Sequence, residues 1–145
     1  MMFEQRMQQL RDRLASAGVD CAVITDDDSV YYFTGYYDYL HMDFGRPTIL
    51  VVPKDGDSVL ITPEMERDMA VGAPVDRLAL WNDGMGQEWR AELPALAAGR
   101  VGIETALMPP PVRSFLVTLV PPDRLGDVTP VIGAMRMIKS PDELQ

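Results

Sequence analysis

The sequence contains few of the side chains that carry covalent or metal-dependent catalysis. It has one cysteine and one histidine among its 145 residues. Cys21 and His41 do not stand at a spacing typical of a nucleophile and its base, and no group of cysteines and histidines has the spacing of a zinc site. A glycine-rich phosphate loop is also missing. We therefore predict no catalytic residue, no metal ligand and no cofactor in this chain.

Basic residues are also scarce, and long apolar runs are absent. Thirteen Lys and Arg residues stand against 22 Asp and Glu, which gives a formal net charge of −9. This balance argues against a nucleic acid partner, because phosphate binding needs clustered positive charge. No segment is apolar for long enough to cross a membrane, and residues 1–10 lack the apolar stretch of a signal peptide. With a lone cysteine that cannot form an internal disulfide, we expect a cytoplasmic protein without a membrane partner.

The sequence does contain an alternation of helical and strand-like segments. Apolar residues recur at helical spacing over residues 3–17, and Gly18 follows as a C-cap. Two strand-like runs, 48–52 and 58–62, flank an Asp-Gly turn and predict a β-hairpin. Further strands are predicted at 21–25, 77–81, 101–104 and 125–129, and further helices at 30–34, from 63 onward, and at 87–98, 111–120 and 131–138. This order predicts an α/β domain with a mixed β-sheet of about five to six strands and helices on both faces.

The short helix over 30–34 gives two finer predictions. Asp28 or Ser29 is expected to cap its N-terminus. Its aromatic residues are expected in the core, namely Tyr31, Tyr32 and Phe33. On the helix that starts at Pro63, the residues expected to face inward are Met65, Met69 and Ala73.

Three consecutive acids, Asp26, Asp27 and Asp28, follow the strand over 21–25. Helix capping accounts for them most simply. The alternative is a Mg²⁺ site of the kind found in phosphate-receiver domains. That alternative would need Asp83 as the phosphorylated residue and Lys139 as the partner lysine. The hairpin argues against it, because it interrupts the alternation of strands and helices that a receiver requires.

Aromatic side chains are concentrated in one stretch. All five tyrosines lie between Tyr31 and Tyr39, and His41, Phe44 and Arg46 follow shortly after. Residues 35–46 show no regular period, so we interpret them as a loop. Tyr and Phe bring a large contact area, and Arg can bind a carboxylate through two parallel hydrogen bonds. The loop is therefore a candidate site for a small carboxylate ligand or for another protein chain.

The C-terminal residues carry a dense helix-start signal. Ser140 can act as an N-cap, Pro141 suits the first helical position, and Glu143 completes a capping box. The chain ends two residues after Glu143, and a helix of about five residues is not stable by itself. A frayed tail is one interpretation. The other is that residues 1–138 form the first domain of a longer protein and residues 139–145 begin the linker or first helix of the next.

Several segments together resemble a known family. Residues 28–36, Asp-Ser-Val-Tyr-Tyr-Phe-Thr-Gly-Tyr, resemble the N-x-x-Y-L-T-G stretch in the N-terminal domain of creatinases, prolidases and Xaa-Pro aminopeptidases. The hairpin over 48–62 follows at the family's place, and residues 101–104 resemble its V-G-I-E strand. Residues 128–132 and 135–143 resemble its D-x-x-P-x-I and R-x-I-K-S-x-x-E stretches. The order and spacing of these segments carry the resemblance, which covers essentially the whole chain.

The resemblance implies a mixed sheet with a ribonuclease H-like motif and a catalytic domain beyond residue 145. In the family, that domain has a pita-bread fold and holds two divalent ions, here expected to be Mn, Co or Zn. The chain itself is therefore expected to be inactive. Its parent is expected to be a homodimeric Xaa-Pro dipeptidase, aminopeptidase or creatinase-like hydrolase that acts on a small peptide or carboxylate substrate.

The resemblance also implies a role for the aromatic loop. Phe44-Gly45-Arg46 resembles the Phe-Gly-Arg of creatinase, whose loop contacts the substrate in the partner subunit's active site. Phe44 is expected to pack against the substrate and Arg46 to bind its anionic end. His41 is expected as a second contact, and Tyr36 completes the predicted substrate-binding set.

Two alternatives to this function stay open. One is a standalone small-ligand or protein-interaction module of the same fold, and the other is a divergent receiver domain. The codons after Gln145 separate the first from the enzyme: a stop codon favours the module, and an Asp, His and Glu metal signature favours the enzyme.

Overall fold

The computed structural model describes residues 2–36, 47–81, 88–96 and 99–137. Six strands form one sheet in the order β4-β3-β2-β1-β5-β6. The strands are β1 (Cys21–Ile24), β2 (Ile49–Pro53), β3 (Val59–Pro63), β4 (Arg77–Trp81), β5 (Val101–Ile103) and β6 (Leu125–Asp127). The helices are α1 (Met2–Ser16), α2 (Asp27–Thr34), α3 (Arg67–Ala70), α4 (Glu88–Leu96), α5 (Pro110–Leu119) and α6 (Thr129–Met137), with 3₁₀ turns at Glu64–Glu66 and Pro122–Arg124.

The sheet is mixed, as predicted. β2 pairs antiparallel with both β1 and β3, which makes the predicted hairpin. β1 pairs with β5, β3 with β4, and β5 with β6, all in parallel. Five strands therefore point the same way, and β2 alone is reversed. The α/β class with a mixed sheet is confirmed.

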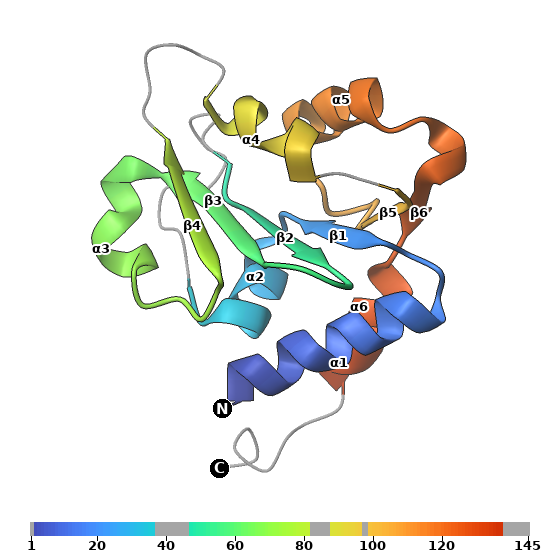
Figure 1. The fold of residues 1–145 in the computed structure, drawn as a ribbon, viewed down its shortest axis with the longest axis horizontal. Coiled ribbons are helices and arrows are strands. Elements are labelled where there is room, and N and C mark those ends of the chain that lie inside the picture. The colour runs from blue at the N-terminus through green and yellow to red at the C-terminus, as the bar shows by residue number, and fades with distance from the viewer. Residues whose placement is uncertain (1, 37–46, 82–87, 97–98, 138–145) are drawn as a thin grey trace.

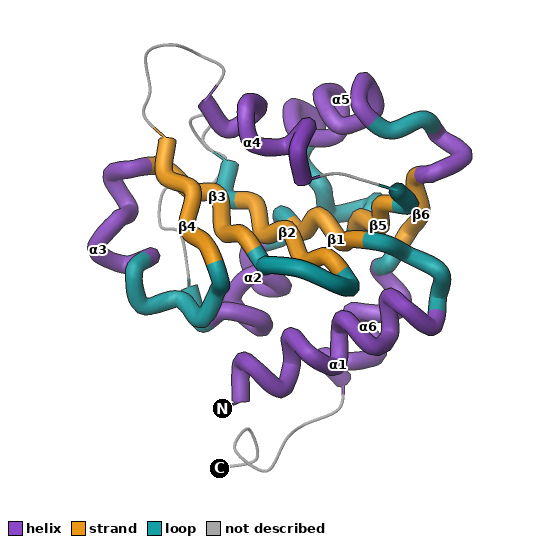
Figure 2. The backbone as a smooth tube through the Cα atoms, in the orientation of Figure 1, coloured by secondary structure: helices purple, strands orange, loops and turns teal. Residues whose placement is uncertain are grey.

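Alternation along the strands divides the core into two layers. Cys21 and Val23 of β1 face one side of the sheet, and Ala22 and Ile24 face the other. Helices α4 and α5 cover the first face, and α1, α2 and α6 cover the second (Figures 1 and 2). The four β1 side chains are buried, so the central strand depends on both helical layers.

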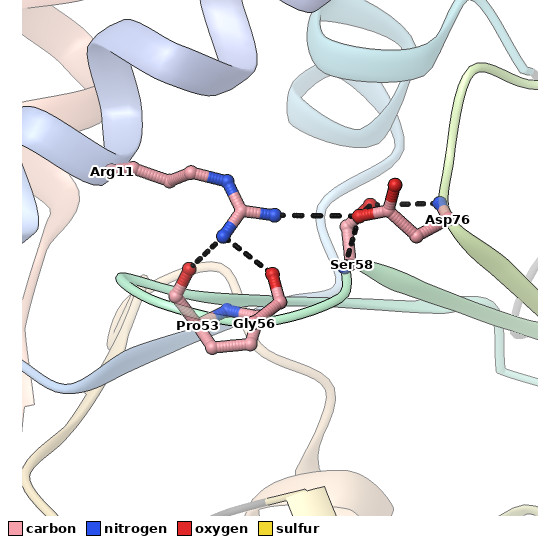
Figure 3. A network of polar contacts seen from close by, with 5 residues as sticks. All are labelled: Arg11, Pro53, Gly56, Ser58 and Asp76. Atoms are coloured by element: carbon pink, nitrogen blue, oxygen red, sulfur yellow. Dashed lines mark hydrogen bonds and ion pairs between the residues drawn. The ribbon is translucent and has the colours of Figure 1, made fainter.

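One arginine on α1 fixes the hairpin turn and the neighbouring strand β4. The Nη1 group of Arg11 donates to the carbonyl oxygens of Pro53 (2.7 Å) and Gly56 (2.6 Å) (Figure 3). Its Nη2 lies 3.6 Å from the Asp76 carboxylate, which in turn accepts hydrogen bonds from the backbone N–H and hydroxyl of Ser58. Two segments that are distant from α1 in sequence, the hairpin turn and the residue before β4, are thus held against it.

The predicted N-cap of α2, Asp28 or Ser29, was wrong by two or three residues. Asp26 caps the helix, because its backbone is extended and its carboxylate accepts from the Ser29 N–H (3.2 Å). The helix therefore begins at Asp27, and Val30, Phe33 and Thr34 form its buried face. Tyr31, which was predicted in the core, lies on the opposite face and is 52% exposed. Phe33 is fully buried as predicted, and Tyr32 is partly buried.

The orientation predicted for Met65 and Met69 was also wrong. Met65 is 61% and Met69 51% exposed, whereas Glu66 and Ala70 are buried. The reason is that the segment starts as a 3₁₀ turn, with three residues per turn, so the face expected for a continuous α-helix is rotated. None of the helices in the described ranges combines the length and apolar character needed to cross a membrane.

Candidate functional site

The strand directions bring several polar residues to one end of the sheet. The carboxyl ends of β1, β3, β4, β5 and β6 lie there, together with the amino end of the reversed strand β2. The segment that joins α2 to β2, which contains the predicted substrate-binding loop, begins and ends at this edge. We take this end of the sheet as the candidate functional site.

The predicted site residues fall into two groups. His41, Phe44 and Arg46 lie outside the described residues. Tyr36 is described, and it is buried, with 3% of its surface exposed. Its contact with substrate stays a prediction, and the observed geometry places its side chain at the base of the loop, inside the domain.

Both ends of the loop are tied to one buried hydroxyl on β3. The Tyr36 hydroxyl shares a hydrogen bond of 2.9 Å with Oγ1 of Thr62, and Oγ1 of Thr48 lies 2.8 Å from the same atom. Tyr36 precedes residues 37–46 and Thr48 follows them. Because all three side chains are buried, the contacts are shielded from competing water. We call this group the loop clamp: Tyr36, Thr48 and Thr62.

A glycine directs the chain from α2 into the loop clamp. Gly35 has φ +72° and ends α2 as a left-handed C-cap, donating its N–H to the Tyr31 carbonyl. A Cβ at this position would lie 2.9 Å from the Phe3 ring, so Phe3 packs against the bare glycine backbone. The Tyr36 N–H then donates to Oγ1 of Thr34 (3.1 Å), which fixes the start of the loop.

A second polar group joins β5, α2 and α6 at the same end of the sheet. The Ser29 hydroxyl donates to Oε2 of Glu104 (2.8 Å). Nη1 of Arg136 donates to Oγ of Ser29 (3.3 Å) and lies 3.7 Å from the Asp26 carboxylate. Glu104 is 2% exposed, and its Oε1 has no hydrogen-bond partner in the described part of the chain. We call this group the acid–arginine cluster: Asp26, Ser29, Glu104 and Arg136.

Burial raises the pKa of Glu104 above its ordinary value, because the ionised carboxylate loses its hydration. The hydrogen bond from Ser29 and the positive charge of Arg136 oppose this rise in pKa. The negative charges of Asp26 and Asp127 add to it. Glu104 thus holds its proton more tightly in the folded chain than in the unfolded one.

The geometry gives these residues a positioning role. In the ranges that the structure describes, no group of three or more His, Cys, Asp or Glu side chains could hold a metal ion. The three acids 26–28 are accounted for by α2 and Arg136. Asp26 caps the helix, Asp27 and Asp28 stand in its first turn, and Asp26 and Asp28 lie near Arg136. What the site can do is hold a loop at fixed ends and connect α2 to α6.

Sequence reasoning did not find the loop clamp or the acid–arginine cluster. Glu104 and Arg136 were both noted as motif positions, but nothing in the motifs indicates that they meet through Ser29. Thr48 and Thr62 were assigned to strands, and their hydroxyls give no local signal of a shared partner. The one sequence signal that could have indicated the loop clamp is a polar residue at the end of an apolar strand, such as Thr62.

We predict that Thr62→Val destabilises this chain by about 1–3 kcal/mol, because two buried hydroxyls lose a hydrogen-bond partner. Tyr36→Phe should cost a similar amount. The double variant should cost less than the sum of the two, since the same contact is lost in both, with a coupling energy of about 0.5–3 kcal/mol. Urea unfolding of the four chains measures this cycle.

Thr118→Val is the matched control, because its hydroxyl bonds to the Phe115 carbonyl on an exposed surface. It should change the free energy of unfolding by no more than about 0.5 kcal/mol. Additive losses for Tyr36→Phe and Thr62→Val would show that the loop clamp is not a coupled unit.

We also predict that Glu104→Gln changes how stability depends on pH. Since the folded chain binds the Glu104 proton more tightly, the native protein loses stability as pH rises from the unfolded pKa, about 4.3, to the raised folded pKa. The variant lacks this loss. Its free energy of unfolding relative to the native chain should therefore increase across that interval and become constant above it.

Asp20→Asn is the control of opposite sign. The Arg100 N–H and Lys54 lower the pKa of Asp20, so its stabilisation is present at neutral pH and is lost as pH falls through the folded pKa. The Asn variant should therefore be less stable than the native chain at neutral pH and approach it in acid. A relative stability of Glu104→Gln that is flat with pH, or that falls as pH rises, would contradict the assignment.

Comparison with known proteins places this geometry in a family. The model of the creatinase/prolidase N-terminal domain matches residues 6–138. A creatinase from Bacillus sp. (strain B-0618) is 25% identical over 97% of this chain. A proline dipeptidase structure from Streptococcus pneumoniae TIGR4 is 26% identical, with a TM-score of 0.77 over 92% of this chain and 98% of that one.

A prolidase structure from Thermococcus sibiricus shares the fold, with a TM-score of 0.82 and 20% identity over 99% of this chain and 39% of that one. The chain spans only 34 to 38% of the length of the longer relatives that it matches in sequence. The family excludes the receiver alternative, whose sheet would lack the reversed strand β2. The chain belongs to the creatinase/prolidase N-terminal domain family.

Proposed function

We propose that this chain is the non-catalytic N-terminal domain of a metal-dependent Xaa-Pro peptidase or a related creatinase-like hydrolase. In that parent it supplies dimer contacts and a loop that faces the substrate. The observation that carries the proposal is the loop clamp, because it fixes both ends of residues 37–46 at one point of a domain that matches the family.

The relatives support a parent with a further domain. Those named above are a creatinase, a proline dipeptidase and a prolidase, and the longer ones extend well beyond the matched region. The residues described here do not fit a metal site, so the two divalent ions that the family implies would be held downstream. When bound, such ions supply an activated water for attack on an amide or related C–N bond.

The loop would then complete the active site of the partner subunit. Arg46 would bind the anionic end of a small peptide or carboxylate substrate, Phe44 would pack against its body, and His41 would make a second polar contact. Tyr36 would act mainly through the loop clamp, because its hydroxyl bonds to Thr62 inside the domain. The parent would be cytoplasmic, consistent with Cys21 as a buried free thiol.

The test compares the parent, its Arg46→Ala variant and this 145-residue chain on Xaa-Pro dipeptides with added Mn²⁺ or Co²⁺. We expect the parent to turn over the substrate and the isolated chain to be inactive. Arg46→Ala should raise KM roughly tenfold to a hundredfold, since a charge-assisted hydrogen bond is worth about 1.5–3 kcal/mol.

Arg13→Ala is the matched control, because Arg13 is an exposed arginine in the last turn of α1. It should leave KM and kcat unchanged. Turnover by the isolated chain would overturn the non-catalytic assignment, and unchanged constants for Arg46→Ala would remove the substrate role of the loop.

A further inference from the structure

A groove of about 420 Å³ lies where α1, α2 and α6 meet. α1 contributes its first turns, α2 its outer face and α6 its last turn. The lining residues are Met2, Phe3, Arg6, Asp28, Tyr31, Tyr32 and Arg136. The groove therefore combines apolar and aromatic side chains with two arginines and one acid.

Internal contacts hold the walls of the groove in place. Arg6 is buried, donates from Nη1 to the Tyr32 carbonyl (2.7 Å) and stacks with its guanidinium 4.0 Å from the Tyr32 ring centroid. The Tyr32 hydroxyl donates to the Met135 carbonyl (3.1 Å), which ties α2 to the last turn of α6. The groove is thus formed in advance of any partner, which reduces the entropy lost on binding.

Arg136 gives the groove its charged contact. Its side chain is about one-third exposed, and it lies 3.7 Å from Asp26 and 4.0 Å from Asp28. The hydrogen bond to Ser29 is also long, at 3.3 Å. A guanidinium has five N–H donors, so Arg136 can donate hydrogen bonds to a further carboxylate without breaking a short contact. The matching partner surface is an apolar or aromatic side chain accompanied by a carboxylate.

The position of the groove indicates what covers it. Arg136 lines the groove and is followed by Met137, the last residue of α6, which is 83% exposed. Any domain that follows α6 is therefore tethered through Met137, next to this groove. The tether gives such a domain a high effective concentration there, so a modest contact area suffices for docking.

Two other exposed apolar areas lack such an indication. Met65, Met69 and Val71 are exposed on the 3₁₀ turn, on α3 and at its C-cap. Val117 is exposed on α5, and Leu107 in the segment before it. Neither area lies where the chain leaves the domain. They serve instead as internal controls for the test below.

We propose that this groove is the docking site of the domain that follows α6 in the parent protein, and that it binds an apolar or aromatic side chain flanked by a carboxylate. The inference rests on one part of the proposed function, namely that a downstream domain exists. It does not depend on the reaction which that domain catalyses.

Hydroxyl-radical footprinting of the parent and of the 145-residue chain tests the docking site. We expect oxidation of Tyr31 and Met137 to be at least about fivefold slower in the parent. Met65 and Met69, which are similarly exposed in this chain, should not show the same protection. Equal oxidation of Tyr31 and Met137 in both proteins overturns the proposal, as does a concentration-dependent protection of Tyr31 in the isolated chain, which would assign the groove to a second copy.

A variant gives an independent readout. Tyr31→Ser should leave the unfolding midpoint of the isolated chain nearly unchanged, because half of the side chain is exposed there. In the parent it should restore fast oxidation of Met137, whereas the control Val117→Ser should not. A parent that hydrolyses Xaa-Pro peptides without protection of Tyr31 overturns the docking site alone. A protected parent without that activity overturns the proposed function alone.

Discussion

The burial of strand β1 on both faces is the constraint on which the rest of this domain depends. Cys21, Ala22, Val23 and Ile24 are buried, and they alternate between the two core layers. β1 must therefore be covered by helices on both sides and paired along both edges, with β2 antiparallel and β5 parallel. Its carboxyl end then passes directly into the Asp26 cap, α2 and the start of the loop.

The two polar groups of the site follow from this arrangement. Because β1, β3 and β5 point the same way, Thr62 at the end of β3 and Glu104 after β5 lie at the same edge as Asp26. The loop clamp fixes the loop ends through neutral hydroxyls. The acid–arginine cluster connects α2 to α6, whose last turn borders the groove. One end of the sheet thus links the two ends of the loop to α6.

Much of the fold could be predicted from the sequence, because its signals are local. The Asp-Gly turn between two apolar runs predicts the hairpin, and alternating elements predict the α/β layers. The exposure of Tyr31 and Met65 was missed, since each depends on where a short helix begins and on its winding. The Asp26 cap was also missed, because each of three adjacent aspartates is equally suited by type to cap a helix.

The contacts of the site could not be predicted because they are not local. Ser29 and Arg136 are separated by 107 positions, and Tyr36 and Thr62 by 26. Serine and threonine at strand or helix ends usually satisfy local backbone groups, so their sequence positions do not indicate a distant partner. The resemblance to the family located the segments correctly, but the pairing of their side chains required the folded chain.

Mixing two impaired versions of the parent, assayed at a substrate concentration well below the native KM, tests the central claim most directly. One subunit carries Arg46→Ala, and the other lacks a metal ligand of the downstream domain. If the loop serves the partner's active site, mixed dimers contain one site with intact metal ligands and an intact Arg46, and hydrolysis of Xaa-Pro dipeptides should recover toward about half of the native rate per mixed dimer. No recovery in dimers shown to be mixed would contradict a loop that acts across the interface.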